Sequence, residues 1–254
     1  MCYFCAVFVL FLCVLVGCVS TGGPQKKVDP KKALETRLQL GLQYLEAGNR
    51  DQALRQFLEV LESDKKNPEA LKGLALIHQM NGEMTEAEAA FKKGIRYAKD
   101  PVESLLRYNY GLFLSRQQRY KEAKSQFEIV AKNLVFTQRA EALYFVGRCA
   151  LELDNKVRAK AAFKHALNLR KNLALPALEL ADLAYQELDY ETAKNYLRRF
   201  NQYSDPSARS LWLGIRIDRT FGHKDKVASQ ALALKNLFGY SNEYLQYKQL
   251  IENN

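Results

Sequence analysis

The side chains that most often carry catalysis are few and scattered in this sequence. His78, His165 and His223 are its three histidines, and they lie roughly 60 to 90 residues apart. Cys149 is the one cysteine beyond residue 18, and no histidine is adjacent to it. Consensus motifs of serine hydrolases, zinc proteases, phosphate-binding loops and dinucleotide-binding loops are absent. We therefore expect no enzyme activity, no metal, no cofactor and no small-molecule substrate, and a buried, inert Cys149.

The other four cysteines lie in an apolar N-terminal segment. Residues 3–19 carry no charge, and as a helix they would reach roughly 25 Å, short of the ~30 Å hydrocarbon core of a bilayer. This length favours a signal peptide that spans residues 1–17. A short uncleaved membrane anchor is the alternative. The segment ends in Leu15-Val16-Gly17-Cys18, which resembles the lipobox of bacterial lipoproteins. The resemblance implies cleavage before Cys18 and lipid attachment to its thiol.

The residues after Cys18 predict where the anchored chain resides. Val19 follows the cysteine instead of Asp, which by resemblance to lipoprotein sorting signals favours the periplasmic face of the outer membrane. Residues 18–30 contain Gly, Lys and Pro and show no apolar periodicity. They therefore predict a lipidated tether and not a folded element.

Composition and charge limit the class of protein and of partner. The 254 residues are 48% hydrophobic and 26% charged, which excludes a disordered or collagen-like chain. Lys and Arg number 38 against 28 Asp and Glu, a net charge of +10. Such an excess suits an acidic protein, an anionic membrane surface or nucleic acid. Because the N-terminus predicts an envelope location, we expect no nucleic-acid partner.

Small residues recur along the chain with a nearly constant period. The first series is spaced by 33 to 36 residues and consists of Gly41, Ala75, Gly111, Gly147, Ala181 and Gly214. Twelve residues after its members stand Ala53, Ala87, Ala123, Ala159 and Ala193, and four residues later stand Phe57, Phe91, Phe127, Phe163 and Leu197. A spacing of four places the alanine and the aromatic residue on one helix face. The pattern predicts repeated pairs of closely packed helices.

A turn is expected between the two helices of each pair, seven residues after the first series. Gly48 and Gly82 mark it in the first two units, and Gln118, Asp154 and Leu188 occupy it later. The sixth unit is degraded, since Lys226 stands where alanine is expected. Gly222 indicates that its turn has slipped by one residue.

These columns resemble the tetratricopeptide repeat, a pair of antiparallel helices about 34 residues long. The resemblance implies an all-α fold, a right-handed superhelix or solenoid of about six repeats over residues 31–254. The units start near residues 34, 68, 104, 140, 174 and 207. Residues 243–252 are expected to form a capping helix.

In this repeat, positions 5, 9, 12 and 13 of the first helix share the inner face of the superhelix. In the first unit three of them are leucines, Leu38, Leu42 and Leu45, which pairing of the two helices does not require. Later units contribute Leu76, Met80, Tyr108, Leu112 and Tyr144. This apolar strip predicts a groove that binds a polypeptide segment. The alternative is that the tether, the cap or tight curvature covers it.

A closer resemblance covers nearly all of the chain after Cys18. The stretches Arg37 to Leu45, Tyr108 to Leu114, Ser210 to Ile215 and Phe238 to Tyr247 are similar to the pilotins, the type IV pilus biogenesis and stability lipoproteins of the PilF/PilW family. The family implies escort of secretin subunits to the outer membrane and promotion of their multimerisation. Two alternatives are a periplasmic scaffold that tethers cell-wall or outer-membrane assembly proteins, and a catalyst with an unrecognised site. We expect a monomer, with self-association through the groove as the alternative.

Overall fold

The computed structural model describes residues 29–252, and over this range the chain folds into thirteen helices and no strand. The signal peptide, Cys18 and most of the tether lie outside the described residues. The helices are α2 (Pro30–Glu46), α3 (Arg50–Ser63), α4 (Pro68–Asn81), α5 (Met84–Tyr97), α6 (Val102–Arg116), α7 (Tyr120–Lys132), α8 (Arg139–Glu152), α9 (Lys156–Leu169), α10 (Ala174–Gln186), α11 (Tyr190–Tyr203), α12 (Ala208–Thr220), α13 (Lys224–Phe238) and α14 (Asn242–Glu252).

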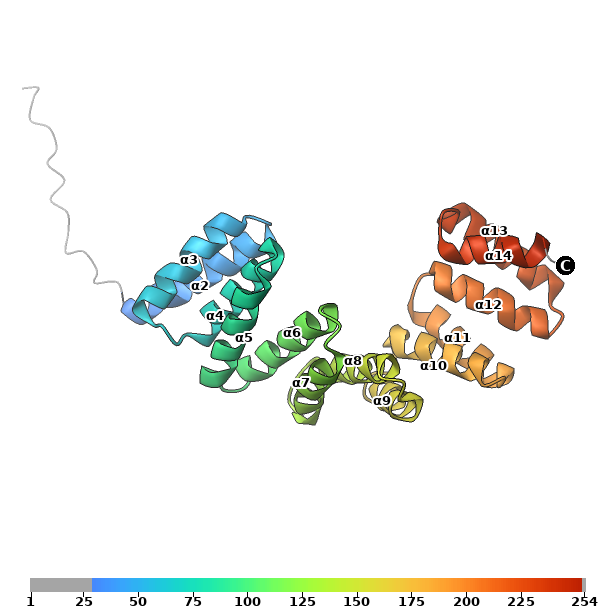
Figure 1. The fold of residues 1–254 in the computed structure, drawn as a ribbon, viewed down its shortest axis with the longest axis horizontal. Helices are drawn as coiled ribbons and strands as arrows, with labels where there is room; N and C mark the ends of the chain where they lie inside the picture. Colours follow the sequence, from blue (N-terminus) through green and yellow to red (C-terminus); the bar gives the residue numbers. More distant parts are fainter. Residues whose placement is uncertain (1–28, 253–254) are drawn as a thin grey trace, which may run out of the picture.

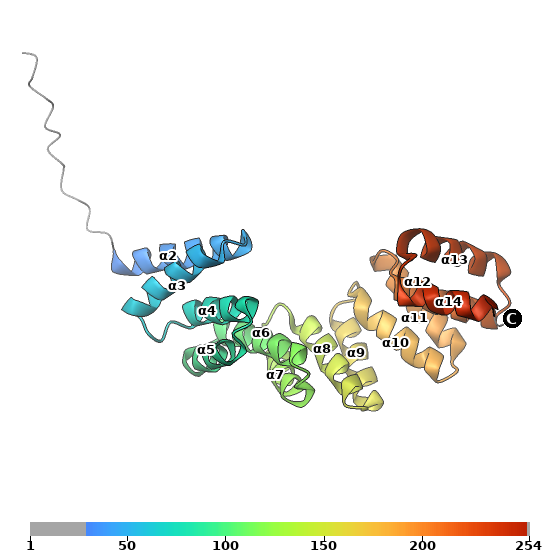
Figure 2. The same cartoon turned by 45° about the horizontal axis from the view of Figure 1, so that its top comes forward.

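Consecutive helices pack as antiparallel pairs, and the six pairs follow one another along an open arch (Figure 1). We call α2, α4, α6, α8, α10 and α12 the first helices and α3, α5, α7, α9, α11 and α13 the second helices. Figure 2 shows the pairs in chain order from one end of the arch to the other, with few contacts beyond neighbours. The predicted all-α solenoid of about six tetratricopeptide repeats is confirmed.

The turns inside the pairs lie at the residues expected from the sequence. Six residues there have positive φ angles between 56° and 83°: Gly48, Gly82, Gln118, Asp154, Leu188 and Gly222. The backbone N–H groups at and after each such residue bond to carbonyl groups in the last turn of the first helix, as for Gly48 to Leu45 and Asn49 to Tyr44. This arrangement satisfies the free carbonyl groups of the helix end. The slip predicted at Gly222 is confirmed.

The core of each repeat is an aromatic side chain placed against a small residue. The alanines of the second series are fully buried, and Phe57, Phe91, Phe127 and Phe163 are as well. A Cβ atom at Gly147 would lie 2.3 Å from the ring of Phe163, so only glycine allows the two helices to approach this closely. Phe57 also reaches the next repeat, because a Cβ atom at Gly73 would lie 2.3 Å from its ring. Each aromatic residue thus joins helices within or between repeats.

The sixth repeat replaces this aromatic contact with a polar one. The side chain facing Gly214 is that of Gln230, whose Oε1 would lie 2.9 Å from an added Cβ atom. Its Nε2 donates to Asp218 at 2.9 Å, and Asp218 also contacts Nδ1 of His223 at 2.8 Å. Because of the slipped turn, Lys226 points to solvent, as its exposure shows. The last pair is therefore held by a small polar cluster beside an apolar one.

The two ends of the solenoid differ slightly from the predicted boundaries. The first helix begins at Pro30, which was assigned to the tether, because Asp29 accepts a hydrogen bond from the Lys31 N–H at 2.9 Å and proline suits the first helical position. At the other end α14 contacts both α12 and α13. Its Tyr244 and Tyr247 pack against the last core cluster, yet no residue of α14 is fully buried.

None of the described helices has both the length and the apolar character needed to cross a bilayer.

Candidate functional site

The first helices line one side of the solenoid, which we call the first-helix face. The pairs α2–α4, α4–α6 and α10–α12 are in contact, and side chains join α6 to α8 and α8 to α10. Eight residues were predicted to line it. Leu38, Tyr108 and Tyr144 are only 7%, 9% and 7% exposed, so their side chains belong to the core. Leu42, Leu45, Leu76 and Leu112 are partly exposed, and Met80 is 48% exposed. The accessible apolar strip therefore consists of these five residues.

The three buried residues share a position in the repeat that the following repeat covers. Leu38 packs in one cluster with Ala70 and Ile77 of α4, and Tyr108 contacts the ring of Phe145 on α8. The predicted strip is thus narrower than the periodicity suggested, because stacking of successive repeats hides one of its rows.

A half-buried lysine lies beside the apolar strip, at the repeat position that Leu38, Tyr108 and Tyr144 occupy in their units. Lys72 lies on α4 and has no hydrogen-bond or ion-pair partner among residues 29–252. Burial lowers the pKa of its ammonium group, partly opposed by the charge of Glu69. Because solvent screens a half-buried charge less than an exposed one, such a group attracts an anionic partner more strongly.

The middle of the first-helix face contains an open cavity of about 360 Å³, which we call the central pocket. It is lined by Leu112, Ser115 and Arg116 of α6, by Tyr120 at the start of α7, and by Phe145, Arg148, Cys149 and Glu152 of α8. Its volume lies within the range of about 300–1,000 Å³ that is typical of ligand sites in proteins. Two successive repeats are needed to build it.

Aromatic packing fixes the position of Phe145 in this pocket. Its ring stacks on Phe127, with centroids 5.1 Å apart and planes 18° apart. The rings of Tyr144 and Tyr108 meet it edge-on at 5.1 and 5.9 Å. Such pairs stabilise one ring orientation. Tyr108 and Tyr144, which were predicted to touch a partner, instead support the side chain that lines the pocket.

Cys149 forms part of the wall but is only 2% exposed. Its Sγ lies 3.6 Å from the Ser115 Oγ, and burial raises the pKa of the thiol. A buried thiol with a raised pKa is a poor nucleophile. The predicted burial of Cys149 is confirmed, and its low reactivity stays a prediction.

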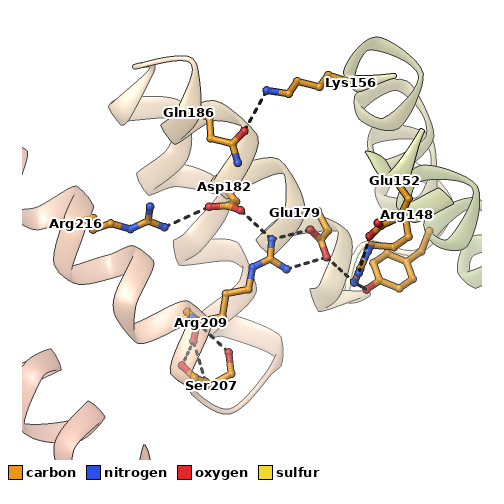
Figure 3. A network of polar contacts seen from close by, with 11 residues as sticks. Arg148, Glu152, Lys156, Glu179, Asp182, Gln186, Ser207, Arg209 and Arg216 are labelled. Atoms are coloured by element: carbon orange, nitrogen blue, oxygen red, sulfur yellow. Dashed lines mark hydrogen bonds and ion pairs between the residues drawn. The ribbon is translucent and has the colours of Figure 1, made fainter. Parts of the chain in front are cut away.

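The first-helix face changes character in the last three repeats, where an ion-pair network crosses it (Figure 3). Glu179 of α10 is 3% exposed. It accepts two hydrogen bonds from Arg209 of α12, at 3.0 and 2.8 Å, and one from Arg148 of α8 at 3.3 Å. Asp182 accepts from Arg209 at 3.0 Å and from Arg216 at 3.4 Å. The network ties three successive first helices together.

Two arginines of the network are further fixed by their surroundings. Burial opposes the charge of Arg209, but the hydrogen bonds and charges of Glu179 and Asp182 raise its pKa. The Arg216 guanidinium lies 4.6 Å from the ring centre of Tyr185, a favourable cation–π geometry. None of these contacts was predicted from the sequence.

A wider open cavity than the central pocket lies elsewhere, between the second helices α9 and α11. Its volume is about 1,010 Å³, and its basic lining residues are Lys171, Arg198 and Arg199. Arg199 donates to the carbonyl oxygens of Leu167 and Lys171 at the end of α9. This cation thereby neutralises a helix C-terminus.

The histidines do not converge on a site. His78 pairs with Glu83 and His223 with Asp218, in different repeats. Over the described part of the chain, no three His, Cys, Asp or Glu residues lie close enough together to hold a metal ion.

The sequence and the fold are both similar to those of known proteins. Residues 38–104 and 140–173 match the tetratricopeptide repeat. The type IV pilus assembly protein PilF of Pseudomonas aeruginosa is 34% identical over 247 residues, which cover 96% of this chain and 97% of PilF. The solved structure of that PilF has a TM-score of 0.80 at 33% identity, covering 86% of this chain and 98% of the PilF chain.

A second solved structure agrees in fold. PilW, a widely conserved type IV pilus biogenesis factor, has a TM-score of 0.71 at 22% identity and covers 85% of this chain and 98% of its own. With 34% identity along nearly the whole of both chains, this chain belongs to the PilF/PilW family of tetratricopeptide-repeat proteins of type IV pilus biogenesis.

Proposed function

We propose that this protein is a pilotin, an outer-membrane lipoprotein that binds secretin subunits and promotes their localisation and multimerisation during type IV pilus assembly. The observation that carries the proposal is the accessible apolar strip of Leu42, Leu45, Leu76, Met80 and Leu112 on the first-helix face. The identity of 34% with a type IV pilus assembly protein supports the pathway. A partly exposed apolar strip is the surface expected for a bound polypeptide segment.

The lipid anchor is proposed from the sequence, since Cys18 lies outside the described residues. Several acyl chains on one cysteine would hold the protein firmly to a single leaflet, because each buried methylene contributes about 0.8 kcal/mol. In this proposal the lipid anchor directs the protein to the outer membrane, and the first-helix face binds the client, which is the secretin subunit. No covalent bond is made or broken.

The double variant Leu42→Glu/Leu45→Glu tests the binding surface. Both side chains are partly exposed, so two carboxylates should weaken capture of secretin at least tenfold while the helical content stays unchanged. Leu58→Glu is a matched control, because Leu58 is a 43% exposed leucine on the second helix of the same repeat. The measurements are secretin binding by the full chain in detergent and far-UV circular dichroism of each variant. Wild-type affinity in the double variant would contradict the proposed surface.

The variant Cys18→Ser, expressed in cells in place of the wild-type protein, tests the lipid anchor. If the lipid directs the protein to the outer membrane, this variant still binds secretin in vitro, while secretin multimers are lost from the outer-membrane fraction. Multimers at the wild-type level would refute the role in localisation. If the wild-type chain binds no secretin at all, the scaffold alternative replaces the pilotin proposal.

A further inference from the structure

We infer that the central pocket receives an apolar side chain of the client segment and that a carboxylate beside this side chain pairs with Arg116. The inference rests on the proposed function, because it assumes that the first-helix face holds a polypeptide. It adds the chemistry of the bound segment and a second contact region, two repeats away from Leu42 and Leu45. The occupant is thus one segment of the partner chain in which an apolar side chain stands beside an acidic one.

The interior of the pocket suits an apolar group. Leu112 and Phe145 contribute carbon surface from α6 and α8, and both side chains are partly exposed. The Phe145 ring is held by three aromatic neighbours, so little freedom is lost when a ligand covers it. Such preorganisation favours binding.

The rim of the pocket offers hydrogen-bond donors that have no partner. Within residues 29–252, neither the Arg116 guanidinium nor the Tyr120 hydroxyl group makes a hydrogen bond or ion pair, although both line the pocket. Arginines nearby are satisfied, since Arg119 binds Glu88 and Glu122, and Arg107 binds Glu103. An exposed, unpaired arginine beside an apolar cavity is suited to a carboxylate of a partner.

The opposite side of the rim gives the bound segment a direction. There Glu152 lies 3.9 Å from Arg148, whose guanidinium is also hydrogen-bonded to Glu179. A carboxylate of the client would be repelled by Glu152 and attracted by Arg116. The acidic residue therefore lies towards α6, and the apolar side chain points down between the two helices.

Lys72 supplies independent support for an acidic client. It is the half-buried, unpaired cation on α4, between the two contact regions. Burial opposes its charge, and a carboxylate of the partner would offset this cost. Lys72 thus adds positive charge beside the strip, while the exposed Arg116 makes the proposed ion pair.

Charge reversal tests the proposed pairing. Arg116→Glu should weaken secretin binding by the full chain at least tenfold, whereas Arg116→Lys should weaken it less, because the charge is kept. Arg198→Glu is the matched control: Arg198 is exposed on α11 and has no carboxylate partner, and its variant should bind as the wild type does. Because Arg116 is exposed, its replacement should leave the fold intact, and a loss of binding then reports on the contact itself.

A compensating change in the client makes the test specific. Asp and Glu residues of secretin are replaced one at a time by Lys, and one of these variants should bind Arg116→Glu at least tenfold better than wild-type secretin does. Ser115→Leu, which fills the pocket, should weaken binding while the melting temperature stays within a few degrees. If Arg116→Glu and Ser115→Leu both bind secretin normally, the inference fails while the proposed function stands. If no secretin binds the wild-type chain, the proposed function itself fails.

Discussion

The first-helix face has two halves that use the same scaffold differently. In the first three repeats it presents partly exposed apolar side chains, of which Met80 is the most exposed. In the last three repeats the corresponding surface carries Glu179 and Asp182 between three arginines. One half leaves surface available to a partner, and the other satisfies its polar groups internally.

Under the proposed function, this difference separates the repeats that bind a partner from the repeats that stiffen the solenoid. The stability of a repeat array is roughly the sum of its repeats and of the interfaces between neighbours. Buried, bidentate arginine pairs add geometric specificity to the interfaces in which they occur. We therefore expect the last three repeats to be the more rigid half and the first three to adapt to a client.

The largest expected effect comes from removing the charge at the centre of the network. Glu179→Gln leaves Arg209 and Arg148 without their shared carboxylate and should lower the free energy of unfolding by about 3 kcal/mol, the lower end of the cost of breaking a buried ion pair. Urea denaturation measures this change, and hydrogen exchange locates it in α10 and α12. Glu187→Gln is the control, because Glu187 pairs with Lys160 at the surface and should cost less than about 1 kcal/mol. Equal losses in both variants would show that the buried network contributes no more than a surface ion pair.

A second variant probes the ion cluster of the first half, which lies off the first-helix face. Glu88 of α5 accepts hydrogen bonds from Arg119 at 2.6 Å and from Tyr110 at 2.8 Å. The hydrogen bond from Arg119 lowers the pKa of Glu88 to about 2. Glu88→Gln should therefore cost about 2 kcal/mol at pH 7, as expected for hydrogen bonds to a charged group.

The pH dependence of this cost follows from the direction of the shift. A carboxyl group with a lowered pKa stabilises the fold fully above its unfolded value near 4.5 and loses this effect as the pH falls towards 2. The difference between wild type and Glu88→Gln should shrink over that interval. Denaturation at pH 7, 4 and 2.5 measures it, and a constant difference would show that the ion pair contributes nothing.

The smallest stability effect is expected on the apolar half itself. Met80 is 48% exposed, so Met80→Ser should change the free energy of unfolding by less than about 1 kcal/mol. Ile77→Ser on the same helix is the contrast, since Ile77 is 1% exposed and its loss should destabilise strongly. Thermal unfolding of both variants compares them. A large loss at Met80 would mean that the strip is core and not a binding surface.

Much of the scaffold could be predicted from the sequence because the repeat is encoded locally. The alanine and aromatic columns set which helix faces pack, and the turn residues from Gly48 to Gly222 lie where the turns are expected. These features depend on spacings of 4, 7 or 12 residues, which helical periodicity fixes.

The candidate site was only partly predictable, since it depends on contacts between repeats. Leu38, Tyr108 and Tyr144 occupy the right helix, but the next repeat covers them. The pairs Arg148–Glu179 and Glu179–Arg209 join residues 31 and 30 positions apart. Their formation depends on the reach of long side chains across a helix interface. Periodicity does not encode that reach.

The polar sixth repeat has a consequence for how the last pair is covered. The ring of Phe57 packs against two glycines, Gly41 in its own pair and Gly73 in the next pair. It therefore joins the first two repeats. Gln230 occupies the equivalent place in the last pair, and its amide is turned towards Asp218. The last pair thus offers an amide where the first pair offers an aromatic ring. Beside this polar contact, Tyr244 and Tyr247 of α14 cover the apolar cluster of the sixth repeat, so the final helix shields carbon surface that a stacked repeat would otherwise bury.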